Sequence, residues 1–270
     1  MAYTATCSDR GAMHRTNQDA LCVQVADTRL GEVAMIVVCD GVGGLTEGEF
    51  ASSTVVNRFV QWFQHELPAK VSYAAMEDDP DLAVVEGDWR VLLARLNAEL
   101  FAYGEERAHM LGTTISALFA MRRRFLVVHV GDGRILKLRR GLVEQVSEDQ
   151  TLLALKLRNG ELLRAEDALP GDANTILQAV GTQERLDPLF YRGDLRTDEL
   201  MIACTDGAWR KATNEGICQI FRGLDFTDEA ELERGCRELV SRDIGMGETD
   251  NISVACLCGV MRGPDGGELR

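Results

Sequence analysis

Residues 33–44 read VAMIVVCDGVGG, and this stretch carries the strongest signal for the fold. Residues 33–39 form a continuous apolar run of strand length. The run stops at Asp40-Gly41, because Asp and Gly favour turns. A carboxylate at the end of a strand has a fixed backbone and lies at the rim of the sheet. We expect such a group to be well placed to hold a hard cation.

The same pattern occurs at three further aspartates. Asp132 follows the apolar run FLVVHVG, Asp206 follows LMIACT, and Asp250 stands just before the apolar run ISVACL. Asp-Gly is a common turn dipeptide, so each junction taken alone indicates a plain turn. Four such junctions together predict that the strand ends converge and bring their carboxylates close to one another. Carboxylates at close range repel one another unless cations lie between them. Oxygen ligands without Cys/His spacing select Mg²⁺ or Mn²⁺.

Composition excludes several classes of protein. Of the 270 residues, 46% are hydrophobic and 27% charged, which is typical of a folded globular chain. The net charge of −14 argues against binding of nucleic acid, and therefore against a two-metal nuclease. We expect no membrane span and no signal peptide, and hence a cytoplasmic location. The eight cysteines form no CxxC pair and are expected to be buried, reduced thiols.

Strands and helices are predicted in alternating groups. The expected strands are residues 21–27, 33–39, 113–121, 125–130, 134–138, 142–146, 175–180, 189–194, 200–204 and 252–260. The expected helices include residues 55–63, after a capping box formed by Thr46 and Glu49, and residues 89–100, 214–222 and 228–241. Residues 72–87 are expected to be a loop. Such grouping favours antiparallel sheets covered by helices, in one domain of residues 1–262 with a flexible tail at 263–270.

Six segments carry a resemblance to a known family when taken in order. They are GAMHRTNQDA (11–20), VVCDGVGG (37–44), GTTISALFA (112–120), VVHVGDGRILKLRRG (127–141), ACTDGAW (203–209) and TDNISVA (249–255). Together they resemble the PP2C-type (PPM) metal-dependent protein phosphatases, in particular the compact bacterial members. The match extends from about residue 3 to residue 260. It implies an α+β fold, an αββα sandwich of two antiparallel sheets flanked by helix pairs.

The resemblance also implies a reaction. Phosphoserine and phosphothreonine in proteins would be hydrolysed by a metal-activated water at a centre of two Mn²⁺ or Mg²⁺ ions, with a third ion bound more weakly. The partners would be phosphorylated proteins, in opposition to a Ser/Thr kinase. The metal ligands carried over from the family are Asp40, Gly41 through its carbonyl, Asp206, Asp250, Asp132 and Asp19. Asp40 would bridge two ions and act with Asp206 in catalysis, and Asp132 would help to hold the third ion.

Three positions depart from the family pattern. His14 stands where the family places an arginine that grips the substrate phosphate, and Arg15 follows it. Arg15 could form a bidentate clamp, His14 could donate one hydrogen bond, or both could be solvated loop residues. Gln18 replaces a frequent Glu, so one ion would carry an extra water. Val42 replaces a His of eukaryotic members, so another group would protonate the leaving group.

A different class of function stays open. The fold could be retained in a catalytically weak pseudophosphatase that acts as a binding or regulatory module, as the change at His14 allows. The complete set of four strand-end aspartates argues against this alternative. The sequence contains no GxSxG elbow, which agrees with direct attack by water.

Overall fold

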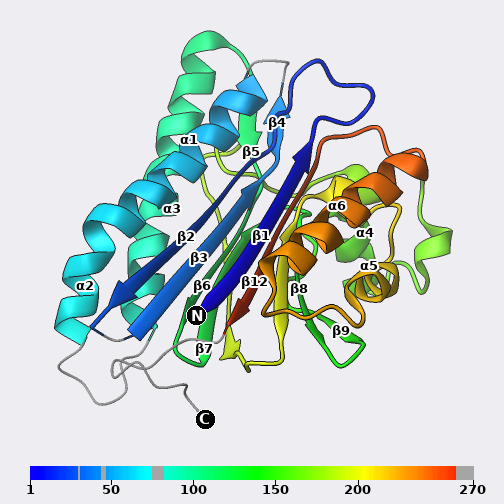
Figure 1. The fold of residues 1–270 in the computed structure, drawn as a ribbon. Coiled ribbons are helices and arrows are strands. Elements are labelled where there is room, and N and C mark those ends of the chain that lie inside the picture. Colours follow the sequence, from blue (N-terminus) through cyan, green and yellow to red (C-terminus); the bar gives the residue numbers. More distant parts are fainter. Residues whose placement is uncertain (30, 44–46, 75–81, 260–270) are drawn as a thin grey trace.

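The computed structural model describes residues 1–29, 31–43, 47–74 and 82–259 (Figure 1). These residues form two five-stranded antiparallel sheets and a short two-stranded pair. Sheet 1 has the order β1 (Ala2–Asp9), β12 (Ile252–Gly259), β11 (Leu200–Cys204), β8 (Arg134–Arg139) and β9 (Leu142–Gln145). Sheet 2 has the order β10 (Leu189–Asp194), β7 (Arg124–Val130), β6 (Ile115–Met121), β3 (Gly31–Cys39) and β2 (Ala20–Thr28). The pair consists of β4 (Gly41–Gly43) and β5 (Leu111–Thr113).

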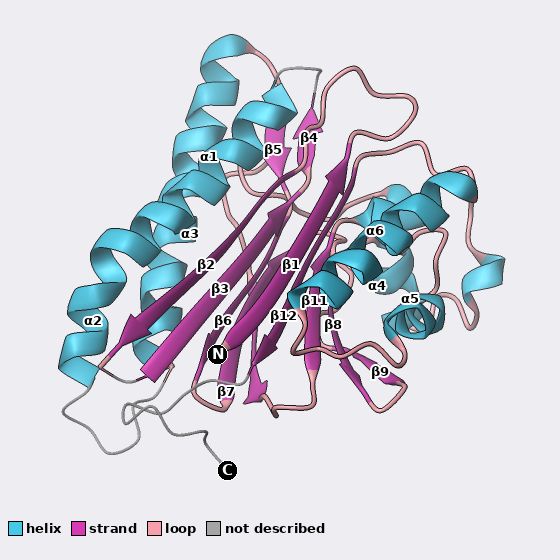
Figure 2. Ribbon diagram, in the orientation of Figure 1, coloured by secondary structure: helices cyan, strands magenta, loops and turns pink. Residues whose placement is uncertain are grey.

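Helices cover the outer faces of both sheets, as Figure 2 shows. The helices are α1 (Glu47–Gln61), α2 (Leu67–Ala74), α3 (Ala83–Arg107), α4 (Leu152–Arg158), α5 (Asn214–Phe221) and α6 (Glu229–Gly245), and a π-helical turn at Trp62–Glu66 joins α1 to α2. The group α1–α3 lies on sheet 2, and α5 and α6 lie on sheet 1. The predicted αββα sandwich is therefore confirmed.

Strand β3 explains how the four layers hold together. All nine of its residues are buried. Alternate side chains of a strand point to opposite faces. Val33, Met35, Val37 and Cys39 pack with the helices, whereas Ala34, Ile36 and Val38 pack against sheet 1. The apolar run that starts the sequence argument is continuous because both of its faces are covered.

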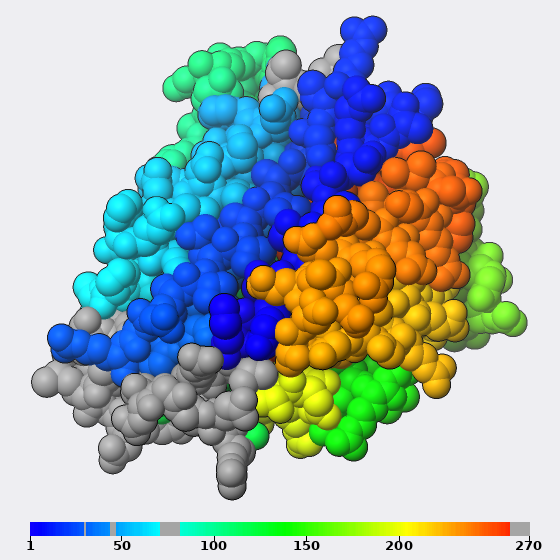
Figure 3. Space-filling model, viewed as in Figure 1, coloured from blue at the N-terminus to red at the C-terminus, as the bar shows by residue number. Residues whose placement is uncertain are grey.

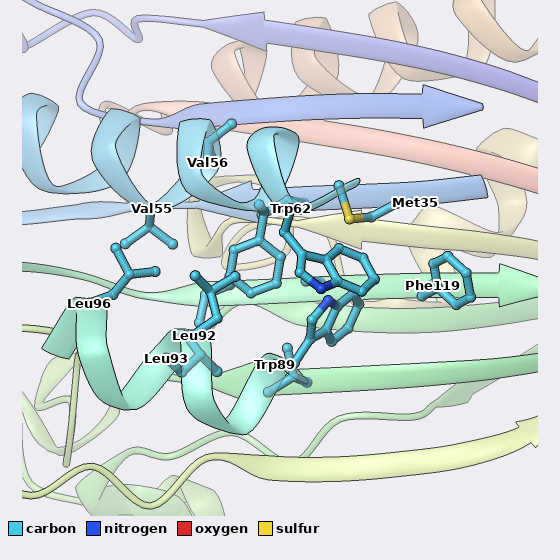
Figure 4. Packing of buried hydrophobic residues seen from close by; sticks show 14 of the residues in the cluster. Met35, Val55, Val56, Trp62, Trp89, Leu92, Leu93, Leu96 and Phe119 are labelled. Carbon is cyan, nitrogen blue, oxygen red and sulfur yellow. The ribbon is translucent and has the colours of Figure 1, made fainter. Parts of the chain in front are cut away.

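An aromatic cluster fixes the helices on sheet 2 (Figure 4). The rings of Trp62 and Trp89 meet edge to face with centroids 5.7 Å apart. Phe119 of β6 lies 6.1 Å from Trp62 and 6.4 Å from Trp89, and Phe59 lies 5.2 Å from Trp89. Edge-to-face contacts add to the free energy gained by burying these large side chains.

The strand predicted at residues 175–180 is wrong. This segment makes only two isolated bridges, Ile176 to Thr151 and Val180 to Thr113. Its apolar residues are spread between two different neighbours, so no continuous ladder forms. The other predicted strands are confirmed, apart from small shifts at their ends and residue 260, which lies outside the described residues.

The predicted loop at residues 72–87 is also largely wrong where the structure describes it. Helix α2 runs to Ala74, and α3 begins at Ala83 because Leu82 and Val85 are buried against the core. Thr46 of the expected capping box and the tail at 263–270 lie outside the described residues. All eight cysteines are free, as predicted, and six are buried, whereas Cys7 and Cys22 are only half-buried. None of the described helices combines the length and apolarity that spanning a membrane requires.

We predict that Trp89→Ala lowers the free energy of unfolding by about 3–5 kcal/mol, because it removes a fully buried ring from the aromatic cluster. Val91→Ala on the same helix is the control, since Val91 is 51% exposed. It should change stability by less than about 0.5 kcal/mol. Urea unfolding followed by circular dichroism measures both. Equal effects of the two substitutions would contradict the packing described here.

Candidate metal centre

The predicted ligands of sheet 2 lie at one end of the sandwich. Asp40 follows the last residue of β3, and Asp19 precedes the first residue of β2. Because these antiparallel strands pair Ala20 with Cys39, the two aspartates stand side by side. β6 continues the antiparallel order from β3 to β7, so the turn with Asp132 after β7 lies at the same end.

Sheet 1 contributes the remaining two predicted ligands, Asp206 and Asp250. Asp206 follows the end of β11, whose neighbours β8 and β12 both begin beside that end. Asp132 lies just before β8 and Asp250 just before β12. Two hydrogen bonds join the sheets here, from Thr205 Oγ1 to Asp19 Oδ2 at 3.0 Å and from the Gln18 amide to Asn251 Oδ1 at 2.8 Å. The fold thus gathers all five aspartates that the sequence predicts as ligands.

The backbone of Asp40 is held rigidly. Its amide donates to Thr114 Oγ1 at 3.0 Å. Its carbonyl accepts from the Thr114 amide and from Thr113 Oγ1, both at 2.8 Å. The GTT motif at 112–114 therefore has a structural role, because its two threonines orient the strand end that carries Asp40.

Gly41 and Gly207 leave no space for a side chain beside the centre. A Cβ on Gly41 would lie 2.3 Å from the carbonyl oxygen of Gly48. A Cβ on Gly207 would lie 2.2 Å from the carbonyl oxygen of Asn251. Glycine therefore lets the first turn of α1 approach Gly41, and it lets the turn with Asp206 approach the turn with Asp250.

The electrostatics agree with a crowded anionic site. Burial raises the pKa of Asp40 well above its usual range, and Asp19, Asp132 and Asp250 raise this pKa further. Burial likewise raises the pKa of Asp19 to about 7 and that of Asp132 to about 6. Each of these groups resists carrying charge unless a cation is supplied.

Arg210 supplies positive charge to the site, and the sequence argument missed it. Its Nη2 pairs with Asp206 Oδ2, and its Nη1 lies 3.3 Å from Asp250 Oδ2. It also lowers the pKa values of Asp40 and Asp132. The one available signal was its position four residues after Asp206, which places both side chains on one side of a helical turn.

The two candidates for the phosphate grip differ in their surroundings. His14 Nε2 lies 3.1 Å from Asp250 Oδ1, so the imidazole borders the carboxylates. Arg15 is exposed, and its carbonyl oxygen accepts a hydrogen bond from Arg10 Nη1 at 3.4 Å. Both residues lie in the β1–β2 loop, drawn in dark blue, which protrudes at the top of the molecule in Figure 3.

Asn251 holds this loop. Its Nδ2 donates to the carbonyl oxygens of Arg10 and Thr16 at 2.7 and 3.4 Å, and its Oδ1 accepts from the Gln18 amide. The backbone amide of Asn251 also donates to Asp250 Oδ1 at 2.9 Å, so this residue orients one of the carboxylates. Its side chain ties the loop that carries His14 to the start of β12.

The turn with Asp132 rests on side chains behind it. Trp209 Nε1 donates to the Asp132 carbonyl oxygen at 3.0 Å, and the guanidinium of Arg134 lies 3.4 Å from the centre of the same indole. His129 is fully buried, and burial lowers its pKa to about 4, so the ring is neutral. Since Nε2 faces the Gly131 carbonyl at 3.0 Å, it carries the proton and donates.

The donor chemistry fits hard divalent cations. Asp19 Oδ1, Asp132 Oδ1 and Asp206 Oδ1 are buried and have no hydrogen-bond partner within the described residues. Buried carboxylate oxygens without a partner are costly unless a cation reaches them. Among the residues that the structure describes, no three His, Cys, Asp or Glu side chains are arranged around a single ion position. Asp206 and Asp250 instead direct oxygens at Arg210.

The segment after Asp149 forms a separate feature beside the centre. It contains α4, and its basic residues are paired, Lys156 with Asp172 at 2.9 Å and Arg164 with Glu166 at 2.8 Å. A hollow of about 690 Å³ lies between this segment and its neighbours, lined by Gln150, Leu155 and Leu177 among others. The hollow adjoins the Asp132 turn, because the Gln150 side chain accepts from the Gly131 amide at 2.8 Å.

Two buried acids support the turns that carry Asp206 and Asp250. Asp243 Oδ1 accepts from the Ala212 amide at 3.0 Å. Glu248 Oε1 accepts from the Thr249 and Asp250 amides at 2.8 and 3.1 Å. The second oxygen of each carboxylate has no partner among the described residues. Burial, with Glu248 nearby, raises the pKa of Asp243 to about 6.

Comparison with known proteins identifies relatives over most of the chain. The sequence profile of the family described as Protein phosphatase 2C matches residues 9–222. Serine/threonine protein phosphatase PstP of Mycobacterium tuberculosis is 27% identical over 259 residues, which cover 93% of this chain and 43% of that relative. The chain thus spans less than half the length of that protein.

Solved structures share the fold. The serine/threonine phosphatase of S. agalactiae superposes with a TM-score of 0.78 at 24% identity, over 95% of this chain and 99% of that one. The catalytic domain of PstP in complex with two manganese ions gives a TM-score of 0.74 at 22% identity, over 95% and 97% of the two chains.

We predict that Asp243→Asn flattens the pH dependence of stability between about pH 4 and pH 6. The folded protein holds the Asp243 proton more tightly than the unfolded chain does, since its pKa is raised from 3.8 to about 6. The wild-type stabilisation from this group is therefore complete below about pH 4 and is lost as the pH rises through about 6.

The difference between wild type and Asp243→Asn should change by at most about 1.4 kcal/mol per pH unit in that window. Urea unfolding of both proteins in EDTA, at half-unit steps of pH, measures this difference. A difference that does not vary with pH would contradict the prediction.

Proposed function

The chain belongs to the protein phosphatase 2C family, and we propose that it hydrolyses phosphoserine and phosphothreonine in proteins with the help of divalent cations. The observation that carries the proposal is the convergence of five aspartates at one end of the sandwich, three of them with buried, unpartnered oxygens. The proposed substrates are phosphorylated proteins, and the proposed opposing enzyme is a Ser/Thr kinase.

The residues proposed to hold the ions are Asp40, Gly41 through its carbonyl, Asp206, Asp250, Asp132 and Asp19. Two ions are proposed in analogy to the PstP catalytic domain in complex with two manganese ions, and a third, weaker one beside Asp132. When bound, Mn²⁺ or Mg²⁺ supplies the positive charge that activates water and neutralises phosphate oxygens. This chain's own contribution is to fix the carboxylates by the backbone contacts described above, such as those of Asp40 with Thr113 and Thr114.

His14 is the better supported candidate for the phosphate grip. Its imidazole borders Asp250, and its side chain is 35% exposed, so a substrate can reach it. A protonated imidazole donates a charge-assisted hydrogen bond to a phosphate oxygen. An arginine can form a bidentate clamp, but the hydrogen bond described for Arg15 involves its backbone carbonyl and not its guanidinium.

The second candidate function is a catalytically weak binding module. One observation favours it: Arg210 pairs with two of the proposed ligands, and no three potential ligand side chains of the described residues surround one ion position. A module of this kind would bind phosphoproteins without turnover. The unpartnered oxygens of Asp19 and Asp132 favour the enzyme.

We predict that Asp40→Asn and Asp206→Asn each lower turnover by more than about 100-fold, the upper end of the effect for a residue that only orients a metal ligand. Release of phosphate from p-nitrophenyl phosphate and from a phosphothreonine peptide is measured with Mn²⁺, with Mg²⁺ and after EDTA. Asp194→Asn is the matched control, because Asp194 ends β10 at the opposite end of the sandwich.

Chelation should abolish the activity of the wild type, and circular dichroism should show that both variants are folded. Turnover by Asp206→Asn equal to that of the wild type would contradict the metal assignment. Absence of turnover in folded wild type with either metal would favour the binding module.

We predict that His14→Ala raises KM about tenfold or more and lowers kcat less, because a charge-assisted hydrogen bond to the ground-state phosphate is lost. Arg15→Ala should change KM less than His14→Ala does. Both are measured at saturating Mn²⁺, so that any effect of His14 on Asp250 is suppressed.

A larger rise in KM for Arg15→Ala would assign the grip to Arg15. Unchanged kinetics in both variants would mean that both are solvated loop residues. His14→Gln keeps one hydrogen-bond donor without the charge and should give an intermediate KM.

A further inference from the structure

We infer that Arg210 is a built-in counter-cation of the carboxylate cluster, which divalent ions must displace, so that Arg210 lowers the affinity of the site for metal. The inference rests on the proposed function, because it assumes that the cluster binds metal. It goes further because it proposes that a residue outside the ligand set, Arg210, lowers the affinity of the site for metal.

The guanidinium competes for the same oxygens as the ions. Arg210 Nη2 pairs with Asp206 Oδ2, and Nη1 lies 3.3 Å from Asp250 Oδ2. It thereby connects the end of β11 to the start of β12 by pairing with two carboxylates that are both proposed metal ligands. An arginine stays protonated at any ordinary pH, so it cannot leave the site by losing its charge.

The chain holds Arg210 in place locally. Asp206–Ala208 form a 3₁₀ turn, and the Arg210 amide donates to the Asp206 carbonyl at 2.9 Å. The side chain is only 29% exposed, so its attraction to the carboxylates is poorly screened by solvent. A divalent ion on Asp206 would therefore meet the positive charge of Arg210 on the same carboxylate and would have to displace it.

Arg210 neutralises the cluster only in part. It contacts Oδ2 of Asp206, whereas Oδ1 of the same residue remains without a partner among the described residues, as do Asp19 Oδ1 and Asp132 Oδ1. The remaining negative charge still attracts cations. Metal ions can therefore still bind to the cluster, and they do so at the expense of the arginine contacts.

The test compares Mn²⁺ binding to wild type and to Arg210→Gln by isothermal titration calorimetry after removal of metal with EDTA. We expect the variant to bind Mn²⁺ about tenfold more tightly or better, which corresponds to about 1.4 kcal/mol. Arg139→Gln is the matched control, because Arg139 is 31% exposed and also faces two carboxylates, Asp198 and Glu199, away from the centre. It should leave the affinity unchanged.

Two further measurements detect the displacement itself. Without metal, Arg210→Gln should unfold at a temperature at least about 2 °C below that of the wild type, and saturating Mg²⁺ should remove this difference. In ¹⁵N-arginine-labelled wild type, the side-chain Nε–H signal that is missing from Arg210→Gln should shift on addition of Mg²⁺.

The outcomes distinguish a failure of the inference about Arg210 from a failure of the proposed function. Equal or weaker Mn²⁺ binding by Arg210→Gln, with wild type active, would overturn the inference and leave the proposed function standing. Binding by neither protein would overturn the proposed metal centre and the inference with it. Binding by Arg210→Gln but not by the wild type would support the inference strongly.

Discussion

Burial of β3 on both of its faces is the constraint from which the rest of the architecture follows. A strand with apolar side chains above and below needs a helical layer on one side and a second sheet on the other. The second sheet must in turn be covered by α5 and α6. Once the sheets are packed, the turns at their shared end lie close to one another, and the aspartates in these turns are brought together.

The carboxylate cluster is therefore imposed by apolar packing and does not itself hold the fold together. Left alone, it would oppose folding, because buried like charges repel. Three sources of positive charge can relieve this repulsion: protons, the guanidinium of Arg210, and external cations. The raised pKa values of Asp19, Asp40 and Asp132 report the cost that any of the three must offset.

Much of this arrangement could be predicted from the sequence because its signals are local. Apolar runs that stop at Asp-Gly define a strand and its terminal carboxylate together, which is why most strands and the aspartates at their ends could be predicted, although β1 was not. The strand predicted at 175–180 was wrong, because residues of this segment make isolated bridges to two different neighbours, and the local sequence pattern does not distinguish such bridges from a continuous ladder. The early start of α3 at Ala83 depends on burial of Leu82 and Val85, which is a tertiary effect.

The supporting residues of the site were harder to predict for the same reason. Thr113, Thr114 and Asn251 act on backbone groups far away in the chain, so their roles exist only once the turns have come together. Arg210 could have been suspected from its spacing to Asp206, but its second partner, Asp250, lies forty residues on.

The pairing of β1 with β12 has a consequence for biosynthesis. All eight residues of β1 pair with β12, from Ala2 opposite Gly259 to Asp9 opposite Ile252. On the ribosome, the first strand therefore emerges on the order of ten seconds or more before its partner, at ordinary rates of elongation. During that interval an unpaired strand edge is open to wrong partners. The carboxylate cluster, which needs residues from Asp19 to Asp250, can form only after residue 250 has left the ribosome.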